Sequence, residues 1–318
     1  MLSIPNACNR KLSKYKMTKI TFISLILLTM QTVVCLCQEK RQDMIWVVLQ
    51  PEAEIDKMID FEIYFACRPD ENSLQIESVA GFEIEGSSIR EKGEVFSFYT
   101  YAKPTKLGEI DIPAISVKID GVEYKSVPIS INIVETLEVD SNSVKTILIS
   151  DSSVYKLQDT IKLSLYQYSR FSNISRQTPV NDKISPLDGI SMERRENEIV
   201  IQNEQTLFEI SGILNLENYL NDNFEITDFK WDPFNQNQTV EKFENEHYIR
   251  TNIFSISLLA GKEGIYMFQP STFEYLVYKS NSDYFKRFSP NKDGSFTITN
   301  EGASEIEVCS NPVTITVK

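Results

Sequence analysis

One alternating pattern occurs twice in this chain and limits its fold more than any other feature. The first copy occupies residues 98–134 and the second occupies residues 254–318. Their opening segments start at Phe98 and Phe254, and each reaches a glycine after the same number of residues. Alternation of apolar and polar residues with a period of two is typical of strands that bury one face. The repeat therefore predicts two related modules, each built around a β-meander.

Shorter runs ahead of each copy support the same fold. Residues 45–49 and 59–65 also have strand character, and about seven short strands fit between residues 38 and 134, which is the size of one immunoglobulin-like sandwich. The sequence therefore predicts an all-β protein made of two tandem immunoglobulin-like β-sandwich domains after an N-terminal signal peptide. Two pairs of short segments are expected to correspond between the modules: 82–84 with 224–226, and 57–60 with 156–159.

The predicted boundaries follow from these signals. They are a signal peptide at 1–37, a first sandwich at 38–135, a short linker at 136–143, and a second sandwich at 144–318 with an insertion at about 169–222. The linker lacks the glycine and proline density of a long tether, so we expect limited swing between the modules. Within the insertion, residues 208–220 fit either a strand or a helical turn.

The N-terminus has the three parts of a secretory signal. Four lysines between positions 11 and 19 precede an apolar run at 20–36, which ends at a cleavage-site pattern around Cys35 and Cys37. We therefore expect export to the periplasm or cell envelope, with Met17 as an alternative start. A lipid anchor is a less favoured alternative, because Leu36 stands where a lipidated Cys37 needs a small residue before it. No later run approaches the ~20 apolar residues of a membrane helix.

Acidic residues outnumber basic residues, 45 to 32, and the formal net charge is −13. Nucleic acids and anionic lipid surfaces are bound by clustered positive charge. The composition therefore argues against a nucleic-acid partner, and the scattered acidic residues are typical of a solvated surface.

Two cysteines, Cys67 and Cys309, remain after the predicted signal peptide. A disulfide between them would join the two modules. Isolated cysteines in apolar strands usually act as small hydrophobic residues. Buried free thiols are therefore favoured over the disulfide.

The polar residues offer little material for catalysis. His247 is the only histidine, so neither a Ser-His-Asp arrangement nor a multi-histidine metal site has much to draw on. Carboxylates two residues apart share one face of a strand and could form acid–base pairs, but they most often face water. Residues 290–294 resemble part of a calcium loop with too few acids, which favours a hairpin turn. We expect a non-enzymatic protein with no catalytic, cofactor or metal site. The carboxylate pairs considered are Glu52 with Glu54, Glu83 with Glu85, and Asp228 with Asp232.

Two sets of motifs, one in each meander, go beyond general β patterning. The first set is Tyr101, Pro104, Lys106, Gly108, Ile112, Pro113, Gly121, Tyr124, Ser126 and Pro128, and the second is the run through Gly264 with residues 310–317. Together they resemble the two repeats of the BatD family, the oxygen-tolerance proteins of the bacterial envelope. The resemblance covers most of the mature chain and is weak between residues 169 and 222.

The resemblance to BatD implies a periplasm-facing protein of tandem β-sandwich domains. It also implies partners: von Willebrand A-domain envelope proteins and other envelope proteins, encoded beside MoxR-type ATPases, with membrane association through these partners. Family members typically continue into a membrane-spanning segment, whereas this chain stops at Lys318. We therefore expect either a short soluble relative or an incomplete sequence.

Two functions remain open at this point. The favoured one is a protein-interaction or scaffolding module of the envelope, which binds through exposed strand edges or through the insertion. The alternative is a secreted carbohydrate-binding or adhesive surface protein, with Trp231, Phe234 and Tyr248 as a stacking platform. The first is favoured because tandem sandwiches without a polar catalytic set usually serve interaction, although fold alone does not assign function.

Overall fold

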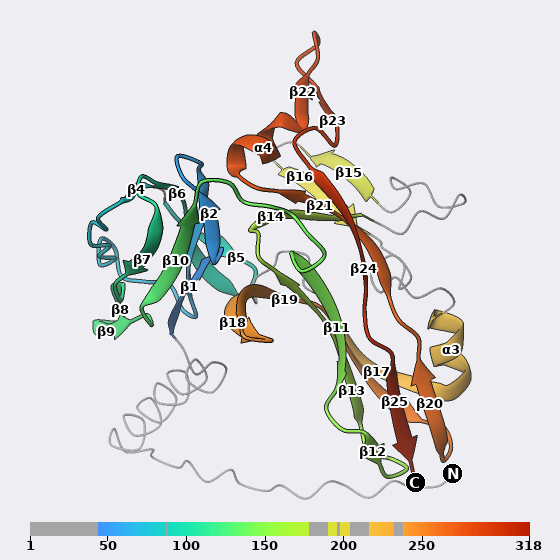
Figure 1. Ribbon diagram of the computed structural model, residues 1–318. Helices are drawn as coiled ribbons and strands as arrows, with labels where there is room; N and C mark the ends of the chain where they lie inside the picture. The colour runs from blue at the N-terminus through green and yellow to red at the C-terminus, as the bar shows by residue number, and fades with distance from the viewer. Residues whose placement is uncertain (1–43, 87, 178–189, 196–197, 204–215, 232–237) are drawn as a thin grey trace, which may run out of the picture. The chain divides into compact units, whose positions relative to one another are not determined.

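The computed structural model describes residues 44–86, 88–177, 190–195, 198–203, 216–231 and 238–318 (Figure 1). The predicted signal peptide lies outside these residues and stays a prediction. In the described part the chain is almost entirely β-structure, which confirms the predicted fold class. Its strands form two groups of sheets in sequence order, which we call the first module (β1–β10) and the second module (β11–β25).

The first module consists of two facing sheets and a hairpin. One sheet has the order β1-β3-β6-β4, with β5 also paired to β6, and the other has the order β2-β10-β7. The closing strand β10 runs parallel to β2 and antiparallel to β7, while β8 and β9 pair with each other. The strands are β1 (Ile45–Leu49), β2 (Glu52–Glu54), β3 (Ile59–Phe65), β4 (Phe82–Glu85), β5 (Ile89–Lys92), β6 (Val95–Pro104), β7 (Gly108–Ile112), β8 (Ser116–Ile119), β9 (Val122–Lys125) and β10 (Ile129–Val134).

The second module repeats the topology of these two sheets strand for strand. Its larger sheet has the order β11-β13-β19-β17, with β18 also paired to β19, and its smaller sheet has the order β12-β25-β20. Here too the closing strand, β25, runs parallel to the short strand β12 and antiparallel to β20. The repeated strands are β11 (Val144–Ser150), β12 (Val154–Tyr155), β13 (Ile161–Ser169), β17 (Phe224–Trp231), β18 (Thr239–Phe243), β19 (Glu246–Ala260), β20 (Gly264–Phe268) and β25 (Val313–Val317).

The repeat holds at the level of single residues. Phe98 on β6 lies opposite Ile63 on β3, and Phe254 on β19 lies opposite Leu165 on β13. All four side chains are at most 9% exposed, because each points between the two sheets of its module. A strand that buries every second residue places its alternate apolar side chains in the core. The repeated sequence pattern therefore places apolar side chains at matching core positions in the two modules.

The predicted correspondence of 82–84 with 224–226 is confirmed, because Phe82 pairs with Pro104 and Phe224 pairs with Ala260 at the same place on β6 and β19. The predicted correspondence of the turns was wrong by three residues. In the structure, residues 54–57 match 156–159, and the central residues Asp56 and Gln158 both have positive φ, at 61° and 85°.

The second module carries two elaborations that join each other. Strand β14 belongs to the first elaboration and pairs with β21 of the second elaboration. Strand β21 also pairs with β24. The sequence predicted only the first elaboration; within its open segment at 208–220, the described end belongs to a helix. The added elements are β14 (Asn173–Gln177), β15 (Ile190–Arg195), β16 (Glu198–Asn203), α3 (Leu216–Asn223), β21 (Thr272–Tyr278), α4 (Asn281–Lys286), β22 (Phe288–Pro290), β23 (Phe296–Ile298) and β24 (Ser304–Cys309).

Two glycines of the second elaboration allow a matched test of its packing. Gly294 and Gly302 have nearly equal positive φ, 84° and 82°. A Cβ at Gly294 would meet nothing within 4 Å, whereas a Cβ at Gly302 would lie 2.5 Å from the carbonyl oxygen of Asp283 in α4. We expect Gly294→Ala to lower the free energy of unfolding by about 1 kcal/mol, from backbone strain alone. Gly302→Ala should lower it further, because α4 must shift. Urea unfolding measures both, and equal losses would contradict this packing.

Candidate binding surface

The smaller sheet of the second module presents apolar side chains to solvent. On β20, Tyr266 and Phe268 point into the core, while Ile265 and Met267 are 74% and 53% exposed. Val154 on β12 is 50% exposed. Large apolar side chains that gather on one outer sheet face are a common mark of an interaction site.

Strand register places these side chains on one surface. Thr316 on β25 pairs with Ile265 on one side and with Val154 on the other. Met267 pairs with Thr314 of the same strand. We call this surface the apolar face and define it by Val154, Ile265, Met267, Thr314 and Thr316.

The equivalent face of the first module is polar at every matching position. In the same register, Glu109 pairs with Asn132, Asn132 pairs with Glu52, and Asp111 pairs with Ser130. These side chains also bond to one another: the Ser130 hydroxyl donates to Asp111 Oδ1 at 2.6 Å, and Asn132 Nδ2 donates to Glu52 Oε1 at 3.4 Å. The two modules therefore have matching core positions but differ in the outer face of the smaller sheet.

The edge of β20 is partly covered by α3. The Tyr219 ring meets Phe268 edge to face, with centroids 5.8 Å apart. Burial raises the pKa of the Tyr219 hydroxyl, and a hydrogen bond with the backbone of Met267 opposes that shift. A strand edge covered in this way is less open to pairing with another strand. The apolar face, rather than the β20 edge, is the open surface here.

A second exposed apolar group lies on the β22–β23 hairpin, which projects from the second module (Figure 1). Phe296 and Ile298 of β23 are each 63% exposed. The turn of this hairpin contains residues 290–294, where the Asn291 N–H donates to the Ser295 carbonyl at 2.8 Å. Asp293 accepts from both the N–H and the hydroxyl of Ser295, and these bonds lower the pKa of its carboxyl. The Asp293 carboxylate is therefore occupied by hydrogen bonds within the hairpin.

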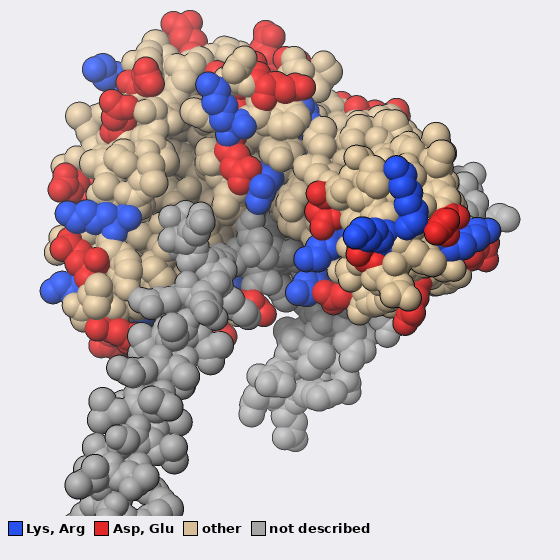
Figure 2. All heavy atoms as spheres, turned by 90° about the horizontal axis from the view of Figure 1, so that it is seen from below, with Lys and Arg blue, Asp and Glu red and all other residues tan. Residues whose placement is uncertain are grey.

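Charged side chains do not separate by sign on the face drawn in Figure 2, where Lys and Arg are interspersed with Asp and Glu. Ion pairs among the described residues show the same mixing, as in Lys286 with Asp283 and Arg250 with Glu241. No patch of a single charge sign therefore stands out on this face.

The two modules share an apolar contact. Val48, Tyr64 and Val95 of the first module form one buried cluster with Ile249 of the second, and Trp46 packs against it. The Trp46 and Tyr64 rings stack with centroids 5.2 Å apart. This cluster forms the apolar part of the contact between the two modules, which we call the junction.

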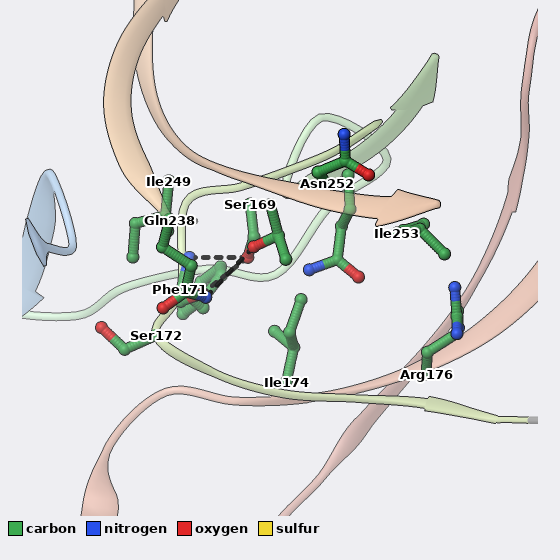
Figure 3. Close-up of a pocket in the computed structure, with 11 residues that line it drawn as sticks. Ser169, Phe171, Ser172, Ile174, Arg176, Gln238, Ile249, Asn252 and Ile253 are labelled. Carbon is green, nitrogen blue, oxygen red and sulfur yellow. Dashed lines mark hydrogen bonds between the residues drawn. The ribbon is translucent and has the colours of Figure 1, made fainter. Parts of the chain in front are cut away.

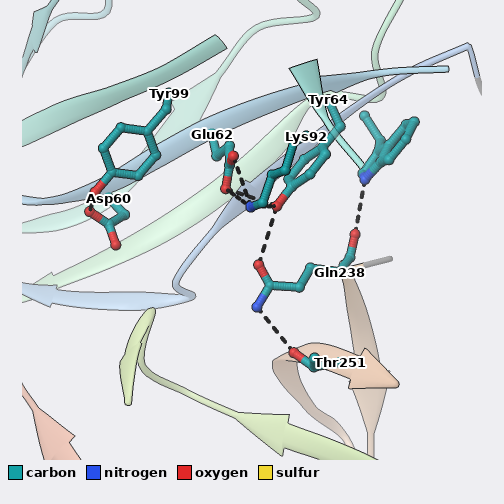
Figure 4. A network of polar contacts seen from close by, with 8 residues as sticks. Asp60, Glu62, Tyr64, Lys92, Tyr99, Gln238 and Thr251 are labelled. Atoms are coloured by element: carbon teal, nitrogen blue, oxygen red, sulfur yellow. Dashed lines mark hydrogen bonds and ion pairs between the residues drawn. The ribbon is translucent and has the colours of Figure 1, made fainter. Parts of the chain in front are cut away.

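Gln238 bridges the junction with polar bonds (Figure 4). Its backbone carbonyl accepts from Trp46 Nε1 at 2.9 Å, and its side-chain oxygen accepts from the Tyr64 hydroxyl at 3.4 Å. Its amide nitrogen donates to Thr251 Oγ1 at 3.1 Å, so one residue contacts both modules. On the first-module side, Lys92 Nζ bonds both carboxylate oxygens of the buried Glu62 at 3.0 Å. These bonds to Lys92 offset the cost of burying the Glu62 charge.

A second set of contacts ties β2 to the second module. Glu52 forms an ion pair with Arg170, and Glu54 accepts from the Leu137 N–H at 2.8 Å. Gln50 Oε1 accepts from the Ser172 N–H at 3.2 Å. Because Leu137 belongs to the predicted linker and is itself buried, the connector is packed rather than loose.

The carboxylate pairs considered from the sequence have structural surroundings. Glu52 and Glu54 serve the junction, and Glu83 and Glu85 are exposed on β4. Asp228 pairs with Lys230 on β17, while Asp232 lies outside the described residues. His247 is exposed near the start of β19 rather than in a loop.

The proposed aromatic platform is not assembled as expected. Tyr248 is only 1% exposed, since its ring packs edge to face against Tyr168 inside the module. Phe234 lies outside the described residues, and Trp231 is the last residue of β17. The expectation that Tyr248 is exposed was wrong, because β19 continues through it and alternation turns it inward.

The alternative of an inter-module disulfide is excluded, because Cys67 and Cys309 are not bonded to each other. The expectation that both are buried was wrong: Cys67 is partly buried, and Cys309 is exposed on β24 with its thiol 3.3 Å from the Thr272 hydroxyl. Within the described ranges, no group of three or more His, Cys, Asp or Glu side chains is placed to hold a metal ion. The same residues include no helix long and apolar enough to cross a membrane.

Comparison with known proteins identifies the first module. Residues 38–133 match the family model described as BatD DUF11 like domain. The first module is a BatD-type domain. This match confirms the BatD resemblance over these residues. No curated protein matches the chain.

The solved structures that align with the chain include bacterial adhesins. The D00-D0 domain of intimin is 8% identical and aligns over 86% of this chain and 99% of its own, with a TM-score of 0.23. The adhesin InvE of Yersinia pseudotuberculosis is 12% identical over 84% of this chain and 58% of its own, with a TM-score of 0.19. FdeC, an Escherichia coli adhesin, is 10% identical over 87% of this chain and 65% of its own, with a TM-score of 0.20. These scores are low, so the strand pairing of this chain carries the description of its fold.

Asp60 provides a pH test of the junction. It accepts hydrogen bonds from the Tyr99 hydroxyl and, at 2.5 Å, from Asn281 Nδ2 of the second module. Burial raises the pKa of Asp60 above its usual 3.8 despite these bonds; the charge of Glu62 adds to the rise and that of Lys92 opposes it.

Because the folded state holds this proton more tightly than the unfolded state, the stabilising contribution is present below the usual pKa and is lost as pH rises through the raised one. Asp60→Asn stays neutral at every pH. Its free energy of unfolding relative to wild type should therefore increase between about pH 3 and pH 7. Urea unfolding at both values, with Glu83→Gln on exposed β4 as the charge control, measures this. A constant or decreasing difference would show that burial does not raise the pKa of Asp60.

Proposed function

We propose that this chain is a non-enzymatic binding module of the bacterial cell envelope that contacts a partner protein through its apolar face. The BatD-type first module and the tandem β-sandwich architecture support this proposal. The partner we propose is a von Willebrand A-domain envelope protein, in a complex served by a MoxR-type ATPase. Export to the periplasm or envelope, and membrane association through the partner, belong to the same proposal.

One observation carries the proposal. Equivalent outer positions of two modules with matching strand registers hold Glu109 and Asp111 in the first and Ile265 and Met267 in the second. The core requires neither pair, because the residues between them, Ile110 and Tyr266, supply the buried contacts. An exposed apolar side chain gains about 1.5–3 kcal/mol when it is fully buried. Burial under a partner is a physical use for such residues, and the centres of protein interfaces are depleted of charge in the same way.

Introducing a carboxylate on the apolar face tests the proposal. Ile265→Glu and Met267→Glu restore the acidic character found in the first module, so both variants should fold normally. Each should weaken binding to a purified von Willebrand A-domain protein of the same envelope at least tenfold, because a buried unpaired carboxylate opposes docking. Calorimetric titration measures the affinity. Val122→Glu is the matched control, because Val122 is as exposed as Met267, at 53%, and lies on the β8–β9 hairpin.

Two further variants separate this surface from its competitors. Phe296→Glu changes the β22–β23 hairpin and should leave affinity unchanged; a loss confined to this variant would move the site to the hairpin. Trp231→Ala should also leave partner binding unchanged. Glycan binding that disappears in Trp231→Ala, with no binding to the envelope protein, would support the carbohydrate-binding alternative instead.

A further inference from the structure

A small cavity lies inside the second module, apart from the apolar face. Its volume is about 130 Å³. One wall is the segment that enters and forms β14, which contributes Ser172, Ile174 and Arg176. These residues are two apart, so they share one side of the extended chain. Figure 3 shows Ser172 and Arg176 toward opposite ends of the cavity, with Ile174 between them.

The opposite wall comes from the main sheet. Gln167 and Ser169 of β13 and Thr251 of β19 give it polar groups, and Ile249 gives it an apolar one. Gln238 also lines the cavity, and it is held there by its bond to Thr251 Oγ1. The cavity is therefore lined by neutral polar and apolar side chains together with one cation.

The cation is Arg176, and it has no carboxylate partner among the described residues. Its Nη1 is fully enclosed and makes no hydrogen bond. The guanidinium stands 5.0 Å over the Phe273 ring, and its cross-strand neighbour is Tyr275, whose hydroxyl bonds Thr146 at 3.2 Å. Burial lowers the pKa of Arg176, yet an arginine side chain stays charged in proteins. A charge is thus held inside the module with an unused donor.

This arrangement is unfavourable unless something compensates it. Burying a charged group without a counter-ion is strongly unfavourable. Ser172 Oγ is also buried without a hydrogen-bond partner. Two side chains that line one cavity, about 130 Å³ in volume, therefore each carry an unsatisfied polar atom, and both come from the same chain segment. Groups of this kind call for a specific explanation such as a ligand.

We propose that this cavity binds a small carboxylate, with the carboxylate oxygens on the Arg176 guanidinium and the other end of the ligand near Ser172. The planar guanidinium fork matches a carboxylate. A cavity of roughly 150 Å³ holds a molecule the size of benzene, so there is room for a short-chain acid. The carboxylate reaches the cavity either as a free acid or as the end of a peptide. This site is independent of partner docking at the apolar face.

Titration with sodium propionate tests the site in the intact exported chain. NMR should show saturable shifts centred on Ile174 and Arg176 that sodium chloride at equal ionic strength does not produce. Arg176→Met should weaken propionate binding at least tenfold, because a hydrogen bond to a charged group is lost. Arg90→Met removes the same charge from an exposed site in the first module and should leave the affinity unchanged. Without ligand, Arg176→Met should melt at a higher temperature than wild type, because the unpaired buried charge is gone.

A second variant guards against misfolding of Arg176→Met. Ile174→Phe fills the cavity while keeping the charge, and it should also abolish the propionate shifts. A short peptide with a free C-terminal carboxylate, compared with its amide, distinguishes a peptide end from a free acid: tighter binding of the free-carboxylate peptide than of propionate assigns the peptide end. Shifts that are absent, that chloride reproduces, or that persist in both Arg176→Met and Ile174→Phe would overturn the proposal.

Discussion

Each module depends on the closure of its smaller sheet by a last strand that pairs on both sides. In the first module β10 holds β2 in parallel and β7 in antiparallel register, and in the second β25 does the same with β12 and β20. Ile131 and Ile315 sit at the centres of these strands, and both are at most 1% exposed. With the closing strand in place, every second residue of three strands faces the larger sheet. Without it, neither smaller sheet could cover its core.

This constraint acts on one side of each strand only. The inward positions keep apolar residues in both modules, whereas the outward positions are released from packing and can diverge. Glu52 shows how a second contact then fixes an outward residue. It pairs with Arg170 of the second module, so its charge serves the junction. Its counterpart Val154 is apolar and 50% exposed. The difference between an acidic and an apolar face therefore grows from what each strand touches on its outer side.

Most of the repeated fold could be predicted from the sequence, because alternation with a period of two is a local signal within each strand. It also contained the apolar face: in Gly264-Ile265-Tyr266-Met267-Phe268 the outward positions are apolar, where Glu109 and Asp111 stand in the first copy. The core pattern did not predict this face, because it constrains only the inward positions of a strand. The second elaboration was missed for another reason. β14 and β21 are far apart in the chain, and their pairing is a long-range choice that no local period announces. The burial of Tyr248 was missed because β19 runs longer than its counterpart β6.

The junction bears on the specificity of the proposed docking at the apolar face. A flexible pair of modules would lose freedom on binding, and this loss opposes affinity. Here the connector residue Leu137 is buried, Gln238 bonds both modules, and Asn281 of α4 donates to Asp60. These contacts hold the second module against the first. Within the second module, the Arg176 guanidinium lies over Phe273, and its Nη1 has no hydrogen-bond partner. Both surfaces are thus preorganised by packing that belongs to the fold itself, which is the condition under which a few exposed side chains suffice for recognition.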